Sequence, residues 1–156
     1  MCMEFISNPN AIILAVTPAN QDPANSDGIK LARMVDPDGI RTIGVLTKVD
    51  IMDHGTDCSE ILLNHVIPLR RGYIGVINRS QKDIMDNVSI RQCLVKEQGY
   101  FQTHPKYRTI SSKCGTMNLT RTLNQLLVHH IRDCLPEIRS KIVAMMNEVH
   151  VSGELR

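Results

Sequence analysis

Residues 42–50 read Thr42-Ile-Gly-Val-Leu-Thr-Lys-Val-Asp50, a short apolar run that ends in a polar turn. Similar runs stand on either side of it along the chain, Ala11-Ile-Ile-Leu-Ala-Val16 and Tyr73-Ile-Gly-Val-Ile77. All three are rich in β-branched residues and lack a clean alternation of apolar and polar side chains, which is typical of strands buried on both faces. We therefore predict three strands of a parallel sheet.

The stretches between these strands carry helical signals. Apolar residues keep helical spacing over 29–35, and Asp36-Pro-Asp-Gly39 predicts the turn that ends this helix. Asp57 and Glu60 have the spacing of a capping box at the start of a second helix, which Pro68 limits. Strands that alternate with helices indicate βαβ units with right-handed crossovers, and hence an α/β fold.

The second half of the chain has a helical pattern. Residues 82–99 predict one weaker helix, and 100–115 predict an irregular segment. From Thr116 apolar side chains recur at intervals of three and four, with an interruption at Pro136. Such an amphipathic helix must pack its apolar stripe against a partner. The stripe comprises Leu119, Leu123, Leu126, Leu127, Ile131, Leu135, Ile138, Ile142, Val143, Met146 and Val149.

Length and composition narrow the possible functions. The 156 residues correspond to one domain, or to one domain with an appendage, at roughly 150 residues per domain. A net charge of +2 and a shortage of aromatic residues argue against nucleic-acid binding. No apolar run is long enough to cross a bilayer. Five cysteines without a Cys-x-x-Cys pair are typical of a reduced cytosolic chain, so we predict neither a disulfide framework nor a metal site.

The sharpest functional signal follows the second strand. In open α/β sheets, ligands bind beyond the carboxyl ends of the strands, and Thr47-Lys-Val-Asp50 stands at such an end. There the Asp50 carboxylate can accept two N–H bonds from a guanine edge, whereas adenine lacks both donors. The aliphatic stem of Lys48 can cover the purine face. The alternative is that Lys48 and Asp50 form a solvated loop pair that binds no ligand.

A second polar segment, Asn78-Arg-Ser-Gln81, follows the third strand and is expected at the same edge of the sheet. Two neighbouring strand ends with polar groups suggest one purine site. The alternative is a polar turn that caps the next helix. No phosphate-binding loop accompanies these segments in the 156 residues, because Gly39-Ile-Arg-Thr-Ile-Gly44 lacks the following Gly-Lys-Ser/Thr and precedes a strand rather than a helix.

Taken together, these segments resemble the dynamin family of large GTPases, and more weakly its vacuolar, peroxisomal and mitochondrial fission members. The similarity runs from Ile6-Ser-Asn-Pro-Asn10 to about Arg139. The strings that carry it are Ile13-Leu-Ala-Val-Thr-Pro-Ala-Asn20, Val35-Asp-Pro-Asp-Gly39, Arg41-Thr-Ile-Gly-Val-Leu-Thr-Lys-Val-Asp50, Pro68-Leu-Arg-Arg-Gly-Tyr-Ile-Gly75, Asn78-Arg-Ser-Gln-Lys-Asp-Ile84 and His129-His-Ile-Arg-Asp-Cys-Leu-Pro136.

The resemblance implies a P-loop-NTPase-type α/β sheet with flanking helices and a long C-terminal helical segment. Residues 1–136 would be the C-terminal part of the G domain, and 137–156 the start of the helical bundle or stalk. The phosphate loop, the switch threonine and the water-positioning D-x-P-G segment of the family have no counterpart here. We therefore expect a fragment without the N-terminal strands, in which Met1 is an internal methionine or the start of a truncated gene model.

The resemblance also implies roles for individual residues. Asp22 and Gln81 match the pair through which two G domains touch, and Pro136 matches the hinge between the G domain and the bundle. Pro23 departs from the apolar residue expected there, but proline is tolerated in a first helical turn, so Asp22 can remain a cap. The nucleotide-binding residues implied are Thr47, Lys48, Val49, Asp50, Asp53, Asn78, Arg79, Ser80 and Gln81.

The function that the resemblance implies is GTP binding in a dynamin-type GTPase of membrane fission or remodelling. The full-length family uses GTP with Mg²⁺, is cytoplasmic and peripherally recruited to organelle membranes, includes microtubule-associated members, and self-associates through the G domain and the stalk. We expect this chain alone to be inactive, because it holds no phosphate loop. The alternative is a non-enzymatic assembly module that oligomerises with full-length partners. A nicotinamide-binding Rossmann domain is disfavoured by the lack of G-x-G-x-x-G.

The first strand carries a further expectation about association. In the P-loop GTPase sheet this strand lies beside the strand that feeds the phosphate loop. Without that neighbour, Ala11–Val16 would present an apolar edge that holds no charged residue. Uncharged edges promote association between chains. We therefore expect self-association of the isolated chain.

Overall fold

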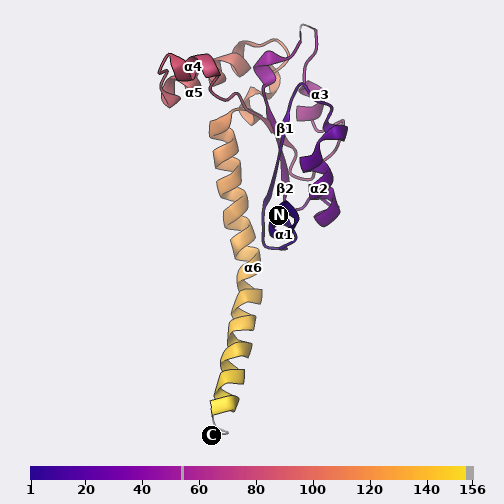
Figure 1. The fold of residues 1–156 in the computed structure, drawn as a ribbon, viewed down its shortest axis with the longest axis vertical. Coiled ribbons are helices and arrows are strands. Elements are labelled where there is room, and N and C mark those ends of the chain that lie inside the picture. The colour runs from indigo at the N-terminus through magenta and orange to yellow at the C-terminus, as the bar shows by residue number, and fades with distance from the viewer. Residues whose placement is uncertain (54, 154–156) are drawn as a thin grey trace. The chain divides into compact units, whose positions relative to one another are not determined.

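The computed structural model describes residues 1–53 and 55–153, with residues 148–153 described by their backbone alone. The chain divides into two compact units, Met1–Arg121 and Thr122–Arg156, and each is described by itself. The first unit holds a three-stranded parallel sheet in the order β1-β2-β3, together with its flanking helices (Figure 1). The predicted α/β class is confirmed.

The three strands are β1 (Ile13–Pro18), β2 (Thr42–Thr47) and β3 (Tyr73–Gly75). All three predicted strands are present, and the third is shorter than expected. In the register, Ala15 of β1 stands beside Gly44 of β2, which stands beside Tyr73 of β3. All three strands therefore end on the same side of the sheet.

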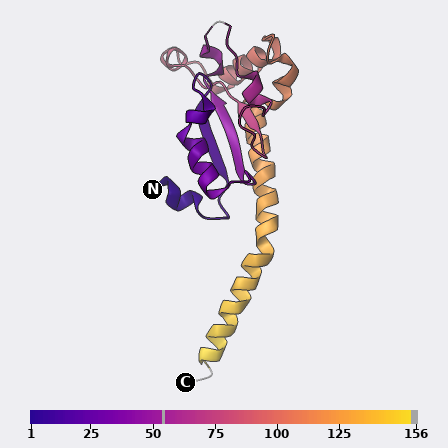
Figure 2. The same cartoon turned by 90° about the vertical axis from the view of Figure 1, so that its right-hand side faces the viewer.

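Burial differs between β1 and the other two strands, and all three residues of β3 are buried. Every residue of β2 from Thr42 to Leu46 is buried, as predicted. In β1 only alternate residues are buried, and Leu14 and Val16 are exposed, so the prediction of burial on both faces is wrong for this strand. Among the described residues β1 pairs with β2 alone, and α2 (Asp27–Val35) packs against it (Figure 2). The alternation shows that one face of β1 is covered and the other is exposed. The edge position does not explain this, because β3 is also an edge strand and is buried throughout.

Gly44 is the point of closest approach within the sheet. A Cβ added to Gly44 would overlap the ring of Tyr73 on the neighbouring strand. Tyr73 is buried, and its hydroxyl donates to the carbonyl of Ile67 at 2.9 Å. This glycine therefore serves packing between β2 and β3, which agrees with the rejection of a phosphate loop at residues 39–44.

The turn between α2 and β2 forms as predicted. Its Gly39 has a φ of 62°, a conformation that glycine adopts without strain. The Asp36 carboxylate accepts from the backbone N–H groups of Ile40 and Arg41, both at 3.0 Å, and from the Thr42 hydroxyl at 2.6 Å. These bonds satisfy a buried carboxylate and set the direction in which β2 begins.

The predicted capping box at residues 57–60 is not formed. The helix α3 spans Ser59–Leu62, and the Asp57 side chain accepts a hydrogen bond from the Ser59 backbone N–H at 2.9 Å. Glu60 instead contacts His65 Nδ1 at 2.9 Å. Because Asp57 stands two residues, not one, before the helix, it makes a local turn and leaves Glu60 free for the other end of α3.

The single helix predicted over 82–99 is two helices, α4 (Gln81–Met85) and α5 (Ile90–Thr103). Asn87 adopts a left-handed φ of 52° between them. Ser89 then begins α5 with a capping box to Gln92. The polar residues between the two helices end α4 and begin α5. The spacing of the apolar residues alone does not predict this break. The remaining short helices are α1 (Cys2–Ile6), η1 (Pro23–Asn25), η2 (Val49–Ile51) and η3 (Arg108–Lys113).

The long helix α6 (Thr116–Gly153) continues through Pro136, so the predicted interruption is wrong. Proline removes one helical N–H bond, but the turns on either side keep theirs, and the Ser140 hydroxyl donates to the Pro136 carbonyl at 3.0 Å. A hinge at Pro136 stays a prediction. In the second unit, Ile131 and Ile138 on the apolar stripe are about half exposed. Val149 of that stripe lies outside the side chains described.

Candidate nucleotide-base site

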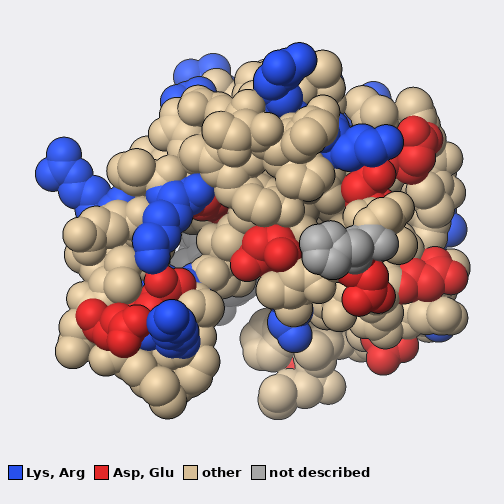
Figure 3. Space-filling model, turned by 90° about the horizontal axis from the view of Figure 1, so that it is seen from above, with Lys and Arg blue, Asp and Glu red and all other residues tan. Residues whose placement is uncertain are grey.

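A cavity of about 220 Å³ lies at the edge where the strands end. Three of the predicted nucleotide-binding residues line it together, namely Asp50 after β2, and Asn78 and Ser80 after β3. The other wall is α5, which supplies Lys96 and Tyr100 among others. Seen from above the sheet, basic and acidic side chains are interspersed on this face, with no large area of one sign (Figure 3). The structure thus brings two distant sequence segments to one site.

The segment after β2 turns sharply, and this turn presents Asp50. Lys48 has a left-handed φ of 59°, Val49 is buried in the core, and Asp50 is exposed at the cavity. The Tyr100 hydroxyl of α5 donates to the Val49 carbonyl at 3.3 Å. Val49 therefore anchors the segment by its side chain and its carbonyl, while the Asp50 carboxylate faces the solvent of the cavity.

The segment after β3 is held at its first and last residues. The Ile77 backbone N–H donates to Glu97 Oε1 at 2.8 Å. Ser80 forms a capping box with Asp83 at the start of α4, so the alternative of a helix-capping turn holds for Ser80. Between these anchors, Asn78 and Arg79 are exposed. The Asn78 side chain therefore lines the cavity and has no role in capping α4.

Two of the charged side chains at the cavity form a salt bridge with each other. Lys96 Nζ lies 2.9 Å from Asp83 Oδ1. Hydrogen bonds from Ser80, and then the one from Lys96, hold the pKa of Asp83 well below its usual range, while Asp83 raises the pKa of Lys96. Burial, and then the Asp50 charge, raise the pKa of Tyr100. Tyr100 therefore keeps its proton at neutral pH. Among the described residues, no salt bridge joins Asp50 to a cation.

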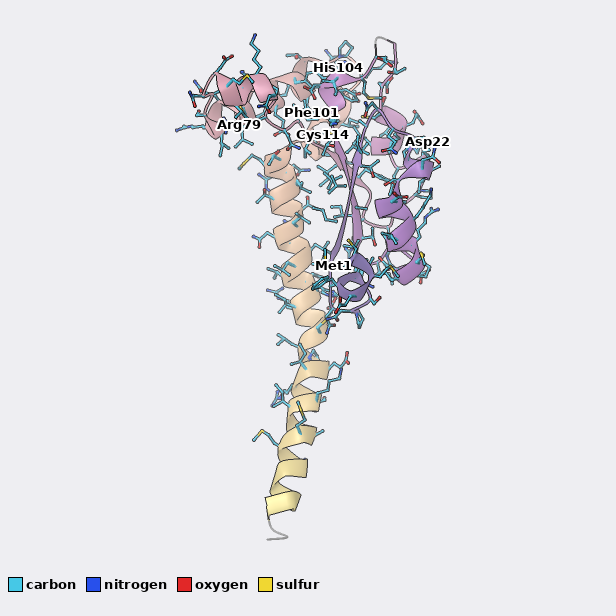
Figure 4. The ribbon with its side chains drawn as sticks, in the orientation of Figure 1. Met1, Asp22, Arg79, Phe101, His104 and Cys114 are labelled. Carbon is cyan, nitrogen blue, oxygen red and sulfur yellow. The ribbon has the colours of Figure 1, made fainter. Side chains whose placement is uncertain are left out.

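Several predicted site residues do not line this cavity. Thr47, Lys48, Asp53, Arg79 and Gln81 lie in the two polar segments or beside them, but outside its wall. Asp22 accepts from the Ala24 backbone N–H at 2.9 Å, so it caps η1 as expected with Pro23 in the first turn. Figure 4 shows Arg79 and Asp22 on different sides of the first unit.

Sequence reasoning missed the wall formed by α5. Lys96, Tyr100 and Glu97 lie 46 residues or more beyond Asp50, and no motif connects them to it. The signal available in the sequence was the helical spacing of Glu97 with the apolar Leu94 and Phe101, because a carboxylate on the apolar face of a helix needs partners. Within the part of the chain that the structure describes, no group of His, Cys, Asp and Glu could hold a metal ion.

Comparison with known proteins places the chain in a family. The family model described as "Dynamin central region" matches residues 57–153, and a second, described as "Dynamin family", matches residues 1–49. The chain belongs to the dynamin family. The resemblance drawn from the sequence segments is confirmed.

Three relatives show how much of a dynamin these residues represent. Over 94% of the present chain, the sequence is 56% identical to Dynamin-2 of Bos taurus. Over 99% of the present chain, it is 56% identical to Vacuolar protein sorting-associated protein 1 of Schizosaccharomyces pombe. It is 55% identical to Dynamin-A of Dictyostelium discoideum over 99%. The chain spans 17%, 23% and 18% of these three proteins. No helix among the described residues is both long and apolar enough to cross a membrane.

Proposed function

We propose that this chain forms the guanine-binding side of a dynamin-type GTPase that acts in membrane remodelling. The observation that carries the proposal is that Asp50 and Asn78, from two different βα segments, line one cavity at the carboxyl edge of the sheet. An ionised carboxylate accepts and does not donate, which suits the N1–H and 2-amino donors of guanine and opposes adenine. An amide side chain can both donate and accept, which suits the remaining polar edge of a purine.

Phosphoryl transfer needs groups of other kinds. In P-loop GTPases a glycine-rich loop with its lysine holds the phosphates, Mg²⁺ neutralises charge, and a positioned water attacks the γ-phosphate. None of the motifs for these groups occurs in the 156 residues. In this proposal the chain binds the base and orients the nucleotide, and the phosphate and Mg²⁺ contacts belong to other parts of a dynamin. The setting proposed is cytoplasmic, with peripheral recruitment to organelle membranes.

We expect the chain to bind GDP and GTP in preference to ADP and ATP, and to hydrolyse none of them. Isothermal titration of each nucleotide into the chain measures the preference, and release of inorganic phosphate measures turnover. Equal affinity for guanine and adenine nucleotides would contradict the base site. Hydrolysis that is lost on Asp50→Ala would contradict the expected inactivity.

A second candidate function is assembly, and the apolar stripe of α6 favours it. In the second unit, Ile131, Leu135, Ile138 and Ile142 follow one another at intervals of three and four, and each is at least 43% exposed. This is the spacing of a helix that pairs with another helix. We therefore expect the chain to self-associate through this stripe.

The assembly test uses charge placed on one face or the other. The double substitution Ile138→Glu and Ile142→Glu should shift sedimentation of the chain toward the monomer, because charges at a helix seam oppose pairing. The matched control, Ser140→Glu with Ala144→Glu, adds the same charge on the opposite face at helical spacing and should leave association unchanged. A monomeric wild-type chain at micromolar concentration, or equal effects of the two pairs, would exclude this role.

A further inference from the structure

Glu97 is a buried carboxylate at the junction of three elements. Its side chain is 3% exposed, on the face of α5 that meets the sheet. Oε1 accepts from the Ile77 backbone N–H at 2.8 Å and from the Thr116 hydroxyl at 3.0 Å. Oε2 accepts from the Thr116 backbone N–H at 2.9 Å. Every bond of this carboxylate therefore goes either to the residue before Asn78 or to the first residue of α6.

The start of α6 and the end of β3 are joined in a second way. The Gly115 backbone N–H donates to the Gly75 carbonyl at 2.8 Å. Gly115 has a φ of 94°, and a Cβ there would stand 3.7 Å from Glu97 Oε2. This geometry brings the first N–H of α6 directly onto the carboxylate. All of these residues belong to the first unit.

Packing alone does not require a charge at this position. Burial of a carboxylate is unfavourable unless hydrogen bonds and a positive field compensate for lost water. Here the two backbone N–H groups and the hydroxyl supply the bonds, and the N-terminus of a long helix supplies the field. Both oxygens must be acceptors, because all three partners are donors. A glutamine would turn one oxygen into an NH₂ group that faces another N–H.

We propose that Glu97 is a positioning residue that couples the base-side loop, residues 77–81, to the first turn of α6. Through it, a bound nucleotide at Asn78 and the start of α6 influence each other's order. The nucleotide part of this inference rests on the proposed function. The mechanical part, the link between Ile77 and Thr116 through one carboxylate, does not.

Amide hydrogen exchange tests the link in the nucleotide-free chain. Thr116→Val removes the hydroxyl bond to Oε1, the oxygen that also binds Ile77, while Thr116→Ser keeps it. We expect the Ile77 amide to exchange severalfold faster in Thr116→Val and about tenfold or more in Glu97→Gln, with Val45 in β2 unchanged. Thr116→Ser should match the wild type. An unchanged Ile77 rate, or an equal rise at Val45, would overturn the inference.

Nucleotide addition separates this inference from the proposed function. In the wild-type chain, saturating GDP should slow exchange at the Thr116 amide, and this effect should be lost in Glu97→Gln, which removes the carboxylate that joins the two amides. If GDP binds without slowing Thr116, the coupling is wrong although the function stands. If GDP does not bind at all, the proposed function fails, and the exchange rates of the nucleotide-free variants still decide the link through Glu97.

Discussion

Replacement of Asp50 by asparagine should weaken GDP binding roughly 10- to 150-fold and remove the preference for guanine over adenine. The basis is the position of this carboxylate at the cavity, where no salt bridge to another described residue engages it. A hydrogen bond to a charged group contributes about 1.5–3 kcal/mol, which is one to two factors of ten in affinity. Asparagine also presents an NH₂ group to the guanine donors, so one of the paired bonds becomes a clash of two donors.

The measurement needs a control that changes charge by the same amount elsewhere. Asp38→Asn serves, because Asp38 is exposed in the turn before β2 and does not line the cavity. Titration of GDP and ADP into the wild type and both variants gives the two affinities. The two substitutions can also be made in a chimeric protein, in which this chain replaces the matching segment of bovine Dynamin-2. The affinities for GDP and ADP are then compared in the same way. An Asp50→Asn variant that keeps both affinity and selectivity would show that Asp50 is a solvated loop residue.

Replacement of Phe101 by alanine should lower the free energy of unfolding by about 3–5 kcal/mol. Phe101 is 1% exposed on α5, with its ring 5.7 Å from that of Tyr100 and 5.9 Å from that of Tyr107, both edge-on. Figure 4 shows it near Cys114, beside the start of α6. Domains of this size are stable by only about 5–15 kcal/mol in total. The loss should therefore loosen the α5 wall of the cavity as well as the core.

Urea unfolding followed by circular dichroism measures this change. The control is Val95→Ala on the same helix, because Val95 is 66% exposed and its truncation removes little buried surface. It should shift the free energy of unfolding by less than about 0.5 kcal/mol. A Phe101→Ala variant that unfolds at the same urea concentration as Val95→Ala would mean that α5 does not close the core in solution.

Features that depend on neighbours along the chain were predictable. The runs of β-branched residues predicted the three strands, and the turn at Asp36–Gly39 formed where its residues indicated. The position of Asp50 and Asn78 at one edge of the sheet was predictable because each comes soon after a strand, and parallel strands end on one side of a sheet. Their binding of a base stays a prediction. The family followed from the same strings, which the match over residues 57–153 confirms.

Features that depend on distant contacts were not predictable in the same way. Whether β1 is buried on both faces depends on what packs on each face, and the exposure of Leu14 and Val16 shows that only one face of this strand is covered. One local feature was also missed: α6 continues through Pro136 because the neighbouring turns keep their own helical hydrogen bonds. The spacing of apolar residues predicts neither the covered face of β1 nor the continuity of α6.

The sequence by itself determined the three strands and their alternation with helices, the two polar segments of the candidate site and the family, because local spacing and side-chain chemistry decide these. Only the tertiary structure decided that α5 closes the cavity and that Glu97 joins Ile77 to Thr116. Glu97 lies about 20 residues from each of these partners. A buried carboxylate takes whichever donors the fold brings within reach, and that choice is made by packing, not by spacing along the chain.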